Sequence, residues 1–142
     1  MSGLAMPQVC EPYTQREARR RIAAGEVVVF AAGTGSPYFT TDTGASLRAI
    51  EIQADLMIKA TKVDGIYDKD PMKHSDAARY DHLDYDQAID QRLAVMDVAA
   101  MILCNDNALD LVVCDINQPG VLLDLAKGKP AGTRVTRREA KA

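Results

Sequence analysis

Short apolar runs alternate along this chain with segments whose apolar positions recur every three or four residues. Three runs predict buried strands because they are nearly continuous in apolar residues: 26–32 (EVVVFAA), 56–61 (LMIKAT) and 111–116 (LVVCDI). Residues 133–136 predict a last strand at the edge of the sheet. Strands that alternate with helices are typical of layered α/β proteins, so we expect an α/β fold with a mostly parallel sheet.

The helices are predicted from their start and stop signals. Pro12 opens a helix that runs through Ile22 and stops at Gly25. Four further helix starts are predicted from capping residues or from proline and glycine: any of Thr41, Asp42 and Thr43, the carboxylate-rich residues 81–90, Asp97, and Pro119-Gly120.

Composition and charge narrow the class of protein. The chain has 142 residues, of which 47% are apolar, and this suffices for one domain spanning residues 1–142. A net charge of -3 and a sequence pI near 5.3 argue against nucleic acid or an anionic membrane as a partner. The basic runs at residues 19–21 and 137–138 are interpreted as solvated helix faces or tails.

The cysteines indicate a reducing compartment. Their number is three, and no pair has CxxC spacing, which argues against a disulfide framework. Cys104 and Cys114 sit in apolar surroundings and are expected to be buried. No signal peptide is recognisable and no apolar run is long enough to span a membrane, so we expect a cytoplasmic protein.

Residues 33–42 (GTGSPYFTTD) join a predicted buried strand to a predicted helix, which is where α/β sheets bind ligands. Gly33 and Gly35 let the backbone approach a ligand closely, and the helix start offers free N–H groups to an anion. Tyr38 and Phe39 either pack on the base or sugar of a ligand or lie in the core of an ordinary strand-to-helix turn. A dinucleotide fingerprint is not favoured, because Tyr38 occupies the position of its third glycine.

Residues 59–71 (KATKVDGIYDKDP) also follow a predicted strand into a loop. Their candidate ligand contacts are two cations for phosphates, an aromatic ring for a base and a carboxylate for a ribose or base: Lys59, Lys62, Tyr67 and Asp70. The alternative is a tight turn at Asp64-Gly65 followed by a solvated loop.

In their order and spacing, these two segments resemble the C-terminal half of the bacterial-type uridylate (UMP) kinases, in the amino acid kinase superfamily. MDVAA (96–100), NQPG (117–120) and GTRV (132–135) resemble the same family. The resemblance is strong from Gly25 to Thr136 and looser from Ser2 to Ala24. It implies a three-layer α/β/α sandwich of the amino acid kinase type with a mostly parallel sheet, of which the N-terminal half is missing.

The resemblance implies transfer of the γ-phosphoryl group of ATP to UMP, giving ADP and UDP for pyrimidine nucleotide biosynthesis. It implies Mg²⁺ carried by ATP, and a homo-oligomer that is commonly a hexamer in the family. Asp42 matches an aspartate close to the transferring phosphoryl group, which we expect to orient lysines or magnesium-bound water. The residues carried over to the UMP site are Thr34, Gly35, Ser36, Pro37, Tyr38, Phe39, Thr40 and Thr41, and those carried over to the ATP site are Thr61, Tyr67 and Asp70.

Three features depart from the family's pattern. Ser36 stands where the family usually has asparagine, which shortens the reach of this side chain toward UMP. Glu26 stands where the family often has an arginine of the allosteric GTP region, which argues against activation by GTP. The family's Lys-x-Ser-Gly-Glu segment and Gly-Gly-Gly-Asn loop, which cradle phosphates, have no counterpart in this sequence.

Three functions therefore compete. The first is UMP kinase, with this chain as a fragment or shortened form; the second is a non-catalytic half-kinase that binds nucleotides or docks to a full-length homologue. The third is another kinase or a storage protein of the same superfamily. Without the phosphate-cradling elements, we expect the isolated chain to bind nucleotide weakly, to transfer no phosphoryl group and to self-associate through uncovered apolar surface.

Overall fold

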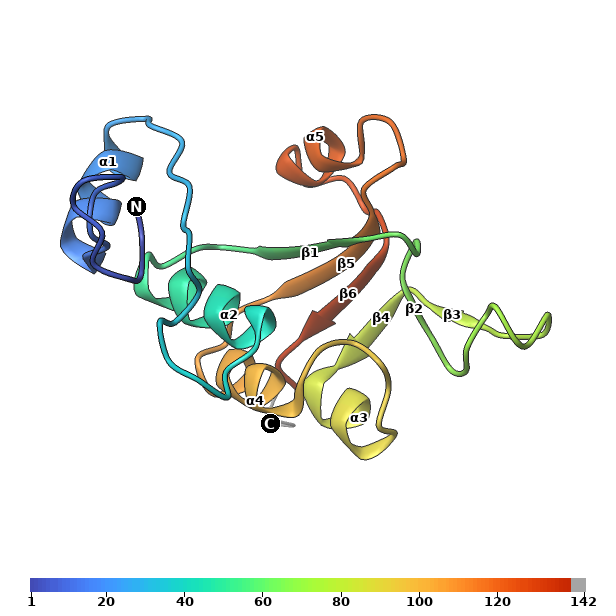
Figure 1. Cartoon of the computed structure of the whole chain (residues 1–142). Coiled ribbons are helices and arrows are strands. Elements are labelled where there is room, and N and C mark those ends of the chain that lie inside the picture. Colours follow the sequence, from blue (N-terminus) through green and yellow to red (C-terminus); the bar gives the residue numbers. More distant parts are fainter. Residues whose placement is uncertain (139–142) are drawn as a thin grey trace. The chain divides into compact units, whose positions relative to one another are not determined.

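A computed structural model describes residues 1–138 of the chain. The chain divides into two compact units, Met1–Ala54 and Asp55–Ala142 (Figure 1). No helix in the described residues is both long enough and apolar enough to cross a membrane.

The second unit is built on a four-stranded sheet. Its described elements are β1 (Met57–Thr61), β2 (Ile66–Tyr67), β3 (Arg79–Tyr80), β4 (His82–Asp84), α3 (Tyr85–Asp90), α4 (Val98–Asp106), β5 (Leu111–Asp115), α5 (Val121–Ala126) and β6 (Thr133–Thr136). The strands of the sheet lie in the order β1-β5-β6-β4, where β1–β5 and β4–β6 are parallel and β5–β6 is antiparallel. Strands β2 and β3 form a separate antiparallel hairpin.

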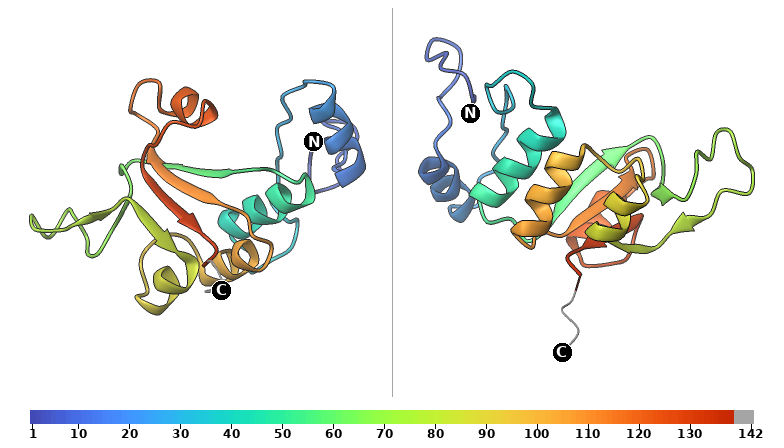
Figure 2. Two further views of the ribbon diagram at one scale, coloured as in Figure 1. Left: turned by 180° about the vertical axis from the view of Figure 1, so that it is seen from behind. Right: turned by 90° about the horizontal axis from the view of Figure 1, so that it is seen from below.

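Helices lie on both faces of the four-stranded sheet (Figures 1 and 2). On one face, Val112 and Cys114 of β5 pack in a buried cluster with Val121 of α5. Successive residues of a strand point to opposite faces, so the buried Leu111 and Val113 face the side of α3 and α4. The predicted α/β/α layering and mostly parallel sheet are confirmed, as is the burial of Cys104 and Cys114.

The sequence patterns locate β1 and β5 correctly, and the strand predicted at residues 133–136 is present as β6. However, β6 lies inside the sheet, between β5 and β4, and its prediction as an edge strand is wrong. The reason is β4, which comes from a carboxylate-rich segment where we expected only a helix start. Leu83 is the one buried residue of β4, so the sequence carries almost no strand signal there.

Predicted helix starts are confirmed for three helices of the second unit. Asp97 caps α4 by accepting a hydrogen bond from the N–H of Ala100 at 2.9 Å, and Gly120 precedes α5. The carboxylate-rich segment 81–90 does contain a helix start, because Asp84 and Gln87 form a reciprocal capping box at the start of α3.

The first unit contains α1 (Gln15–Ala23) and α2 (Thr41–Glu51). Thr14 caps α1, so this helix begins three residues after the predicted opening at Pro12, and Gly25 follows its last turn with φ 82°. Thr40 caps α2 by accepting from the N–H of Thr43 at 3.3 Å. Asp42 therefore lies in the first turn of α2 and is not its cap, because Thr40 occupies the position where a side chain reaches back to the free N–H groups.

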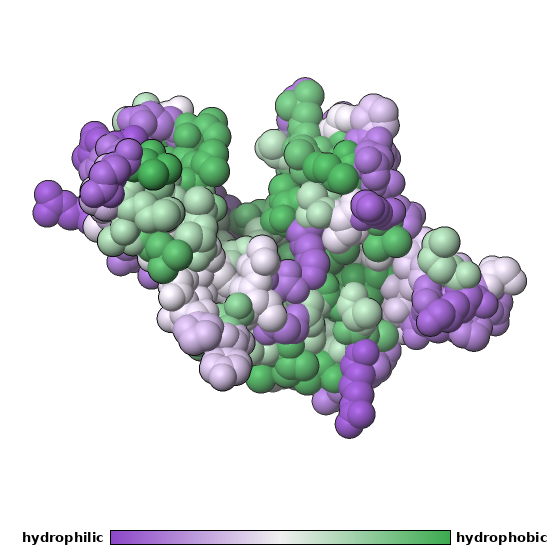
Figure 3. All heavy atoms as spheres, viewed as in Figure 1, coloured by the Kyte–Doolittle hydropathy of each residue, from purple (hydrophilic) through white to green (hydrophobic). Residues whose placement is uncertain are grey.

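The strand predicted at residues 26–32 does not form. These residues contain only an isolated bridge, between Ala31 and Ser2. Val27 and Val29 are 95% and 72% exposed, and Figure 3 shows apolar side chains at the surface in this part of the first unit. The prediction of a buried strand is wrong here, and within the first unit Phe30 alone of this run packs on an aromatic ring, that of Tyr13 at 5.5 Å.

Hydrogen bonding along this segment explains the missing strand. The α-amino group of Met1 donates to the carbonyl of Val29 at 2.7 Å, and the N–H of Ala31 donates to the carbonyl of Met1 at 2.9 Å. On the opposite edge, Val28 and Phe30 have no backbone partner among residues 1–138. A buried strand needs partners on both edges, since an unpaired buried N–H or carbonyl is costly.

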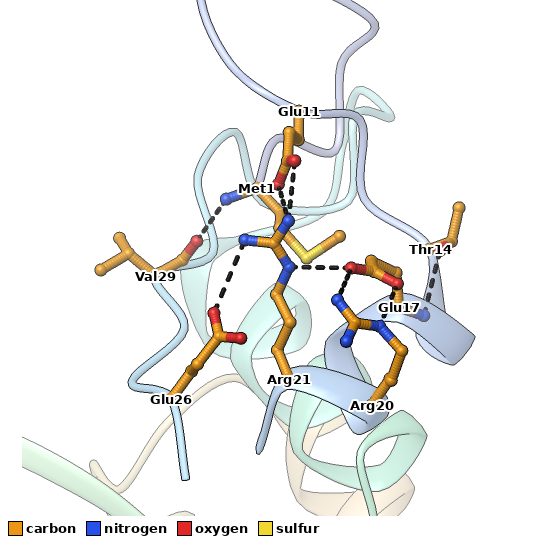
Figure 4. Close-up of polar contacts among 8 residues, drawn as sticks. All are labelled: Met1, Glu11, Thr14, Glu17, Arg20, Arg21, Glu26 and Val29. Atoms are coloured by element: carbon orange, nitrogen blue, oxygen red, sulfur yellow. Dashed lines mark hydrogen bonds and ion pairs between the residues drawn. The ribbon is translucent and has the colours of Figure 1, made fainter. Parts of the chain in front are cut away.

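Polar contacts hold the ends of α1 to the chain around it (Figure 4). The guanidinium group of Arg21 contacts Glu11 at 2.6 Å, Glu17 at 2.9 Å and Glu26 at 3.7 Å. Hydrogen bonds from Arg20 and then Arg21 lower the pKa of Glu17 to about 2. The interpretation of the whole run 19–21 as a solvated face is therefore wrong for Arg21, because its charge is shared among carboxylates on three segments.

Candidate functional site

A cavity of about 390 Å³ lies in the second unit, next to the β2–β3 hairpin and the turn that follows α3. Two segments line it, comprising Val63, Gly65, Ile66, Tyr67, Asp68, Lys69, Asp70 and Pro71 from the first and Gln91, Arg92, Leu93 and Ala94 from the second. Tyr67 and Asp70, both predicted for the ATP site, are thus brought together in one cavity. Its size and its mixture of apolar and charged groups suit a small polar ligand.

A buried hydroxyl anchors the hairpin that borders the cavity. The N–H of Ile66 donates to Oγ1 of Thr133 at 2.9 Å, and the Thr133 hydroxyl donates to the carbonyl of Tyr80. A Cβ at Gly65 would lie 2.5 Å from the same Oγ1, so this position requires glycine because two segments approach closely. The Asp64-Gly65 pair is therefore more than a tight turn, since it lets the hairpin reach β6.

The ring of Tyr67 is held by its hydroxyl. This hydroxyl donates to Oδ1 of Asp64 at 2.7 Å, and Arg79 contacts the same carboxylate at 3.1 Å. The hydrogen bond lowers the pKa of Asp64 and raises the pKa of Tyr67. Because the hydroxyl is committed to Asp64, the ring is the group that Tyr67 offers to a ligand.

Asp70 is held as a carboxylate at the rim of the cavity. Its Oδ1 accepts the N–H of Met72 at 2.9 Å, and this hydrogen bond lowers the pKa of Asp70. Thr61 does not line the cavity: its hydroxyl donates to the carbonyl of Val63 at 2.9 Å and accepts the N–H of the same residue at 3.0 Å. Thr61 therefore shapes the edge of the cavity through Val63.

The turn after α3 was not predicted as part of a site. Its N–H groups at Arg92 and Leu93 donate back to the carbonyls of Ile89 and Ala88, both at 3.0 Å, and Arg92 has a φ of 52°. This is the hydrogen-bond pattern of a helix that ends in a left-handed residue, a position at which glycine is usual. A side chain there costs about 1 kcal/mol. No sequence signal marks the turn, because arginine at this position neither ends a helix by propensity nor belongs to the motif around Tyr67.

The residues predicted for UMP form one exposed loop of the first unit. The hydroxyl of Thr34 accepts the N–H of Ser36 at 3.1 Å, and Gly33 and Gly35 have φ values of 55° and 73°. Tyr38 is fully exposed and Phe39 is 56% exposed, so the alternative that these rings belong to a core is wrong. The loop thus presents hydroxyls and two aromatic rings to solvent. Its predicted members are Thr34, Gly35, Ser36, Pro37, Tyr38, Phe39, Thr40 and Thr41.

Asp42 lies directly after this loop and is half-buried. Its carbonyl accepts a hydrogen bond from the hydroxyl of Ser46 at 2.9 Å within the first turns of α2.

A second cavity, of about 470 Å³, lies beside α5 in the second unit and contains none of the predicted site residues. Its cations Arg79, Lys129 and Arg134 each have a carboxylate partner, at 3.1, 2.9 and 2.6 Å. Residues 1–138 contain no cluster of three or more His, Cys, Asp or Glu side chains that could hold a metal ion.

Comparison with known families matches residues 4–115 to the amino acid kinase family. The chain belongs to the amino acid kinase family. Within residues 4–115 lie the exposed loop of the first unit, Asp42 and all residues that line the 390 Å³ cavity.

Among individual proteins, this amino acid kinase chain is similar to uridylate kinases. It is 54% identical to that of Acinetobacter baylyi over 137 residues, which cover 96% of this chain and 57% of that protein. It is 56% identical to that of Xanthomonas oryzae pv. oryzae over 135 residues, which cover 95% of this chain and 56% of that protein. The chain therefore spans little more than half the length of these curated relatives.

Solved structures give the same picture of this amino acid kinase chain. The UMP kinase from Bacillus anthracis superposes with a TM-score of 0.94 at 32% identity, covering 97% of this chain and 57% of that one. The uridylate kinase from Archaeoglobus fulgidus gives a TM-score of 0.70 at 31% identity, covering 87% and 58%.

Proposed function

We propose that this chain supplies the nucleotide-binding part of a uridylate kinase, which transfers the γ-phosphoryl group of ATP to UMP to give ADP and UDP. The observation that carries the proposal is the cavity in which Tyr67 and Asp70 lie together. These two residues come from the segment that carries the resemblance to uridylate kinases, and the named relatives of this chain are uridylate kinases.

The cavity divides chemically into parts that fit an adenine nucleotide. Val63, Ile66, Leu93 and Ala94 are apolar and suit the faces of a base. The ring of Tyr67, oriented by Asp64, adds an aromatic contact. Asp70, which its lowered pKa keeps ionised at neutral pH, accepts hydrogen bonds from ribose hydroxyls.

We assign UMP to the loop of the first unit. The hydroxyls of Thr34, Ser36 and Thr40 offer hydrogen bonds to its polar groups, and the exposed rings of Tyr38 and Phe39 offer stacking faces. Asp42 follows the loop and is proposed to act beside the transferring phosphoryl group, where it orients cations toward the developing charge.

Magnesium enters this proposal with the nucleotide. The proposal takes the ion to be held mainly by the phosphates of ATP, because Mg²⁺ is usually bound through one or two carboxylates plus substrate phosphates. When bound, Mg²⁺ would neutralise phosphate charge, and Asp42 is the residue that would orient water in its shell.

The proposal also includes a cellular compartment and an oligomeric state. Cys104 and Cys114 are buried and form no disulfide within residues 1–138, which fits the reducing cytoplasm that we propose. The exposed Val27 and Val29 fit an assembly in which this surface is covered, and we propose a homo-oligomer of the complete kinase.

A chimera tests the proposed activity. The matched portion of the Acinetobacter baylyi uridylate kinase is replaced by this chain, and UDP formation from UMP, ATP and Mg²⁺ is measured. We expect turnover in the chimera and a fall in kcat with little change in UMP affinity for Asp42→Asn, since a group that acts on the transition state affects rate more than ground-state binding. A correctly folded chimera without turnover would overturn the proposal.

A second candidate is a non-catalytic half-kinase, which would bind nucleotide in the same cavity of Tyr67 and Asp70 without turnover. The two candidates differ in what the 142-residue chain does alone. We expect it to bind ATP weakly and to form no UDP. Such a result combined with an inactive chimera favours the half-kinase, whereas an active chimera favours the kinase.

A further inference from the structure

Arg92 differs from the other charged residues of the ATP cavity in its partners. Lys69 lies 2.6 Å from Asp76, so its charge is already balanced within the chain. The guanidinium group of Arg92 makes no ion pair or side-chain hydrogen bond with another residue in the described part of the chain. The cavity wall thus contains one cation whose donors remain available.

The same cavity wall contains carboxylates, whose negative charge disfavours an anionic ligand. Asp68 accepts the N–H of Ala78 at 2.8 Å. Asp70 accepts the N–H of Met72 at 2.9 Å and lies 3.3 Å from the ammonium group of Lys73. Since Lys69 and Lys73 are both paired with carboxylates, a nucleotide phosphate beside Asp68 and Asp70 needs a further cation. Arg92 is placed to supply it, because it lines the same cavity as Tyr67.

We propose that Arg92 binds the phosphate chain of the adenine nucleotide, an assignment that rests on the proposed function of the cavity. A guanidinium group presents paired N–H donors that match two phosphate oxygens, and charge-assisted hydrogen bonds of this kind are among the strongest in proteins. The turn after α3 fixes the backbone from which the side chain extends.

The backbone conformation of Arg92 allows a test in which one substitution should raise the Tm and lower the affinity for ATP. Its φ of 52° is one that glycine adopts without strain. Arg92→Gly therefore removes the cation while relieving the backbone, so we expect a higher Tm together with weaker ATP binding. A residue with only a structural role would not separate the two readouts in this way.

Ala108 provides a matched control. It also has a φ of 52°, and it follows α4 with the same hydrogen-bond pattern, from Ala108 to Asn105 and from Leu109 to Cys104. Ala108 does not line the ATP cavity. We expect Ala108→Gly to raise the Tm and to leave ATP binding unchanged.

The experiment uses the complete 142-residue chain and isothermal titration calorimetry with ATP and with adenosine. We expect Arg92→Gly to weaken ATP binding about tenfold or more, as loss of a charge-assisted hydrogen bond predicts. Adenosine has no phosphate, and Arg92→Gly loses only the charge-assisted contact to phosphate. The affinity of Arg92→Gly for adenosine should therefore lie within about twofold of that of the unmodified chain. Arg92→Lys should bind ATP with intermediate affinity, because lysine keeps the charge but not the paired donors.

Three outcomes would overturn the assignment. Equal ATP binding by Arg92→Gly and the unmodified chain shows that Arg92 does not contact ATP. Equal losses for ATP and adenosine show that Arg92 contacts the base or ribose. Failure of the unmodified chain to bind ATP overturns the ATP site itself, and is distinguished from the other two because it appears before any substitution is made.

Discussion

The two units of this chain are stabilised by different kinds of contact. Among residues 1–138, 20 apolar residues are buried, and only two of these, Ala18 and Ala49, belong to the first unit. The second unit has a core on both faces of its sheet, whereas the first unit relies on polar contacts. A segment of a protein can therefore contain apolar residues typical of a core without forming a core of its own.

The first unit's own contacts illustrate the difference. Tyr13 donates to Glu51 at 2.5 Å, lies under Arg48 at 3.8 Å and meets the edge of Phe30 at 5.5 Å. Burial and the neighbouring Glu51 raise the pKa of Tyr13 to about 12. Such contacts orient the chain well, but solvent-exposed polar pairs contribute little net stability compared with a buried apolar side chain.

The largest expected effect comes from truncating one apolar side chain in each unit. Leu111→Ala, at a position that is fully buried in the second unit, should lower the free energy of unfolding by about 2–5 kcal/mol. Val27→Ala, in the first unit, should change it by less than about 0.5 kcal/mol because the side chain is 95% exposed. Urea unfolding followed by circular dichroism measures both, and similar losses at the two positions would break the comparison.

Self-association should come from the first unit. The exposed Val29 and the backbone of Val28 and Phe30, which has no partner among residues 1–138, form an apolar segment that can pair with another chain as an open strand edge does. We expect the unmodified chain to associate as its concentration rises and Val29→Lys to reduce that association. Sedimentation velocity over a range of concentrations measures it, with the exposed Met72→Lys of the second unit as control. A chain that stays monomeric throughout would contradict this prediction.

Removal of a helix cap should have a smaller effect on stability, and the effect should again differ between the two units. Asp84→Ala removes one side of the capping box of α3 and should destabilise the second unit by about 1 kcal/mol. Thr14→Ala removes a single 3.3 Å hydrogen bond from α1 and should cost less, at the low end of about 0.5–2 kcal/mol. Hydrogen exchange of the amides of each helix separates the two effects, and a larger effect for Thr14 would reverse the expected order.

The smallest expected effect is the loss of stability of α1 at low pH. Hydrogen bonds from Arg20 and Arg21 lower the pKa of Glu17 from 4.5 to about 2, so the stability contributed by Glu17 is present above pH 4.5. It should be lost as the pH falls from 4.5 toward 2. An NMR pH titration of α1 checks this window, and Glu17→Gln should show the loosened state of the helix already at neutral pH. No change in the α1 signals between pH 4.5 and 2 would contradict the assignment.

Some features of this protein follow from the sequence by itself. The apolar runs locate β1 and β5, Asp97 and Gly120 mark helix starts, and the apolar surroundings of Cys104 and Cys114 predict their burial. The two motif segments point to the amino acid kinase family, to which the chain belongs. These features are local, because propensity, capping and motif chemistry depend on residues within a few positions of one another.

Other features are decided only by the tertiary structure. The run at residues 26–32 has the composition of a buried strand but remains exposed, since burial depends on partners elsewhere in the chain. The place of β6 in the sheet depends on β4, whose own sequence carries little strand signal. Arg92 joins the cavity of Tyr67 across 25 positions of sequence because the turn after α3 folds against the hairpin. Contacts between distant residues are set by the packing of whole elements, which no local pattern encodes.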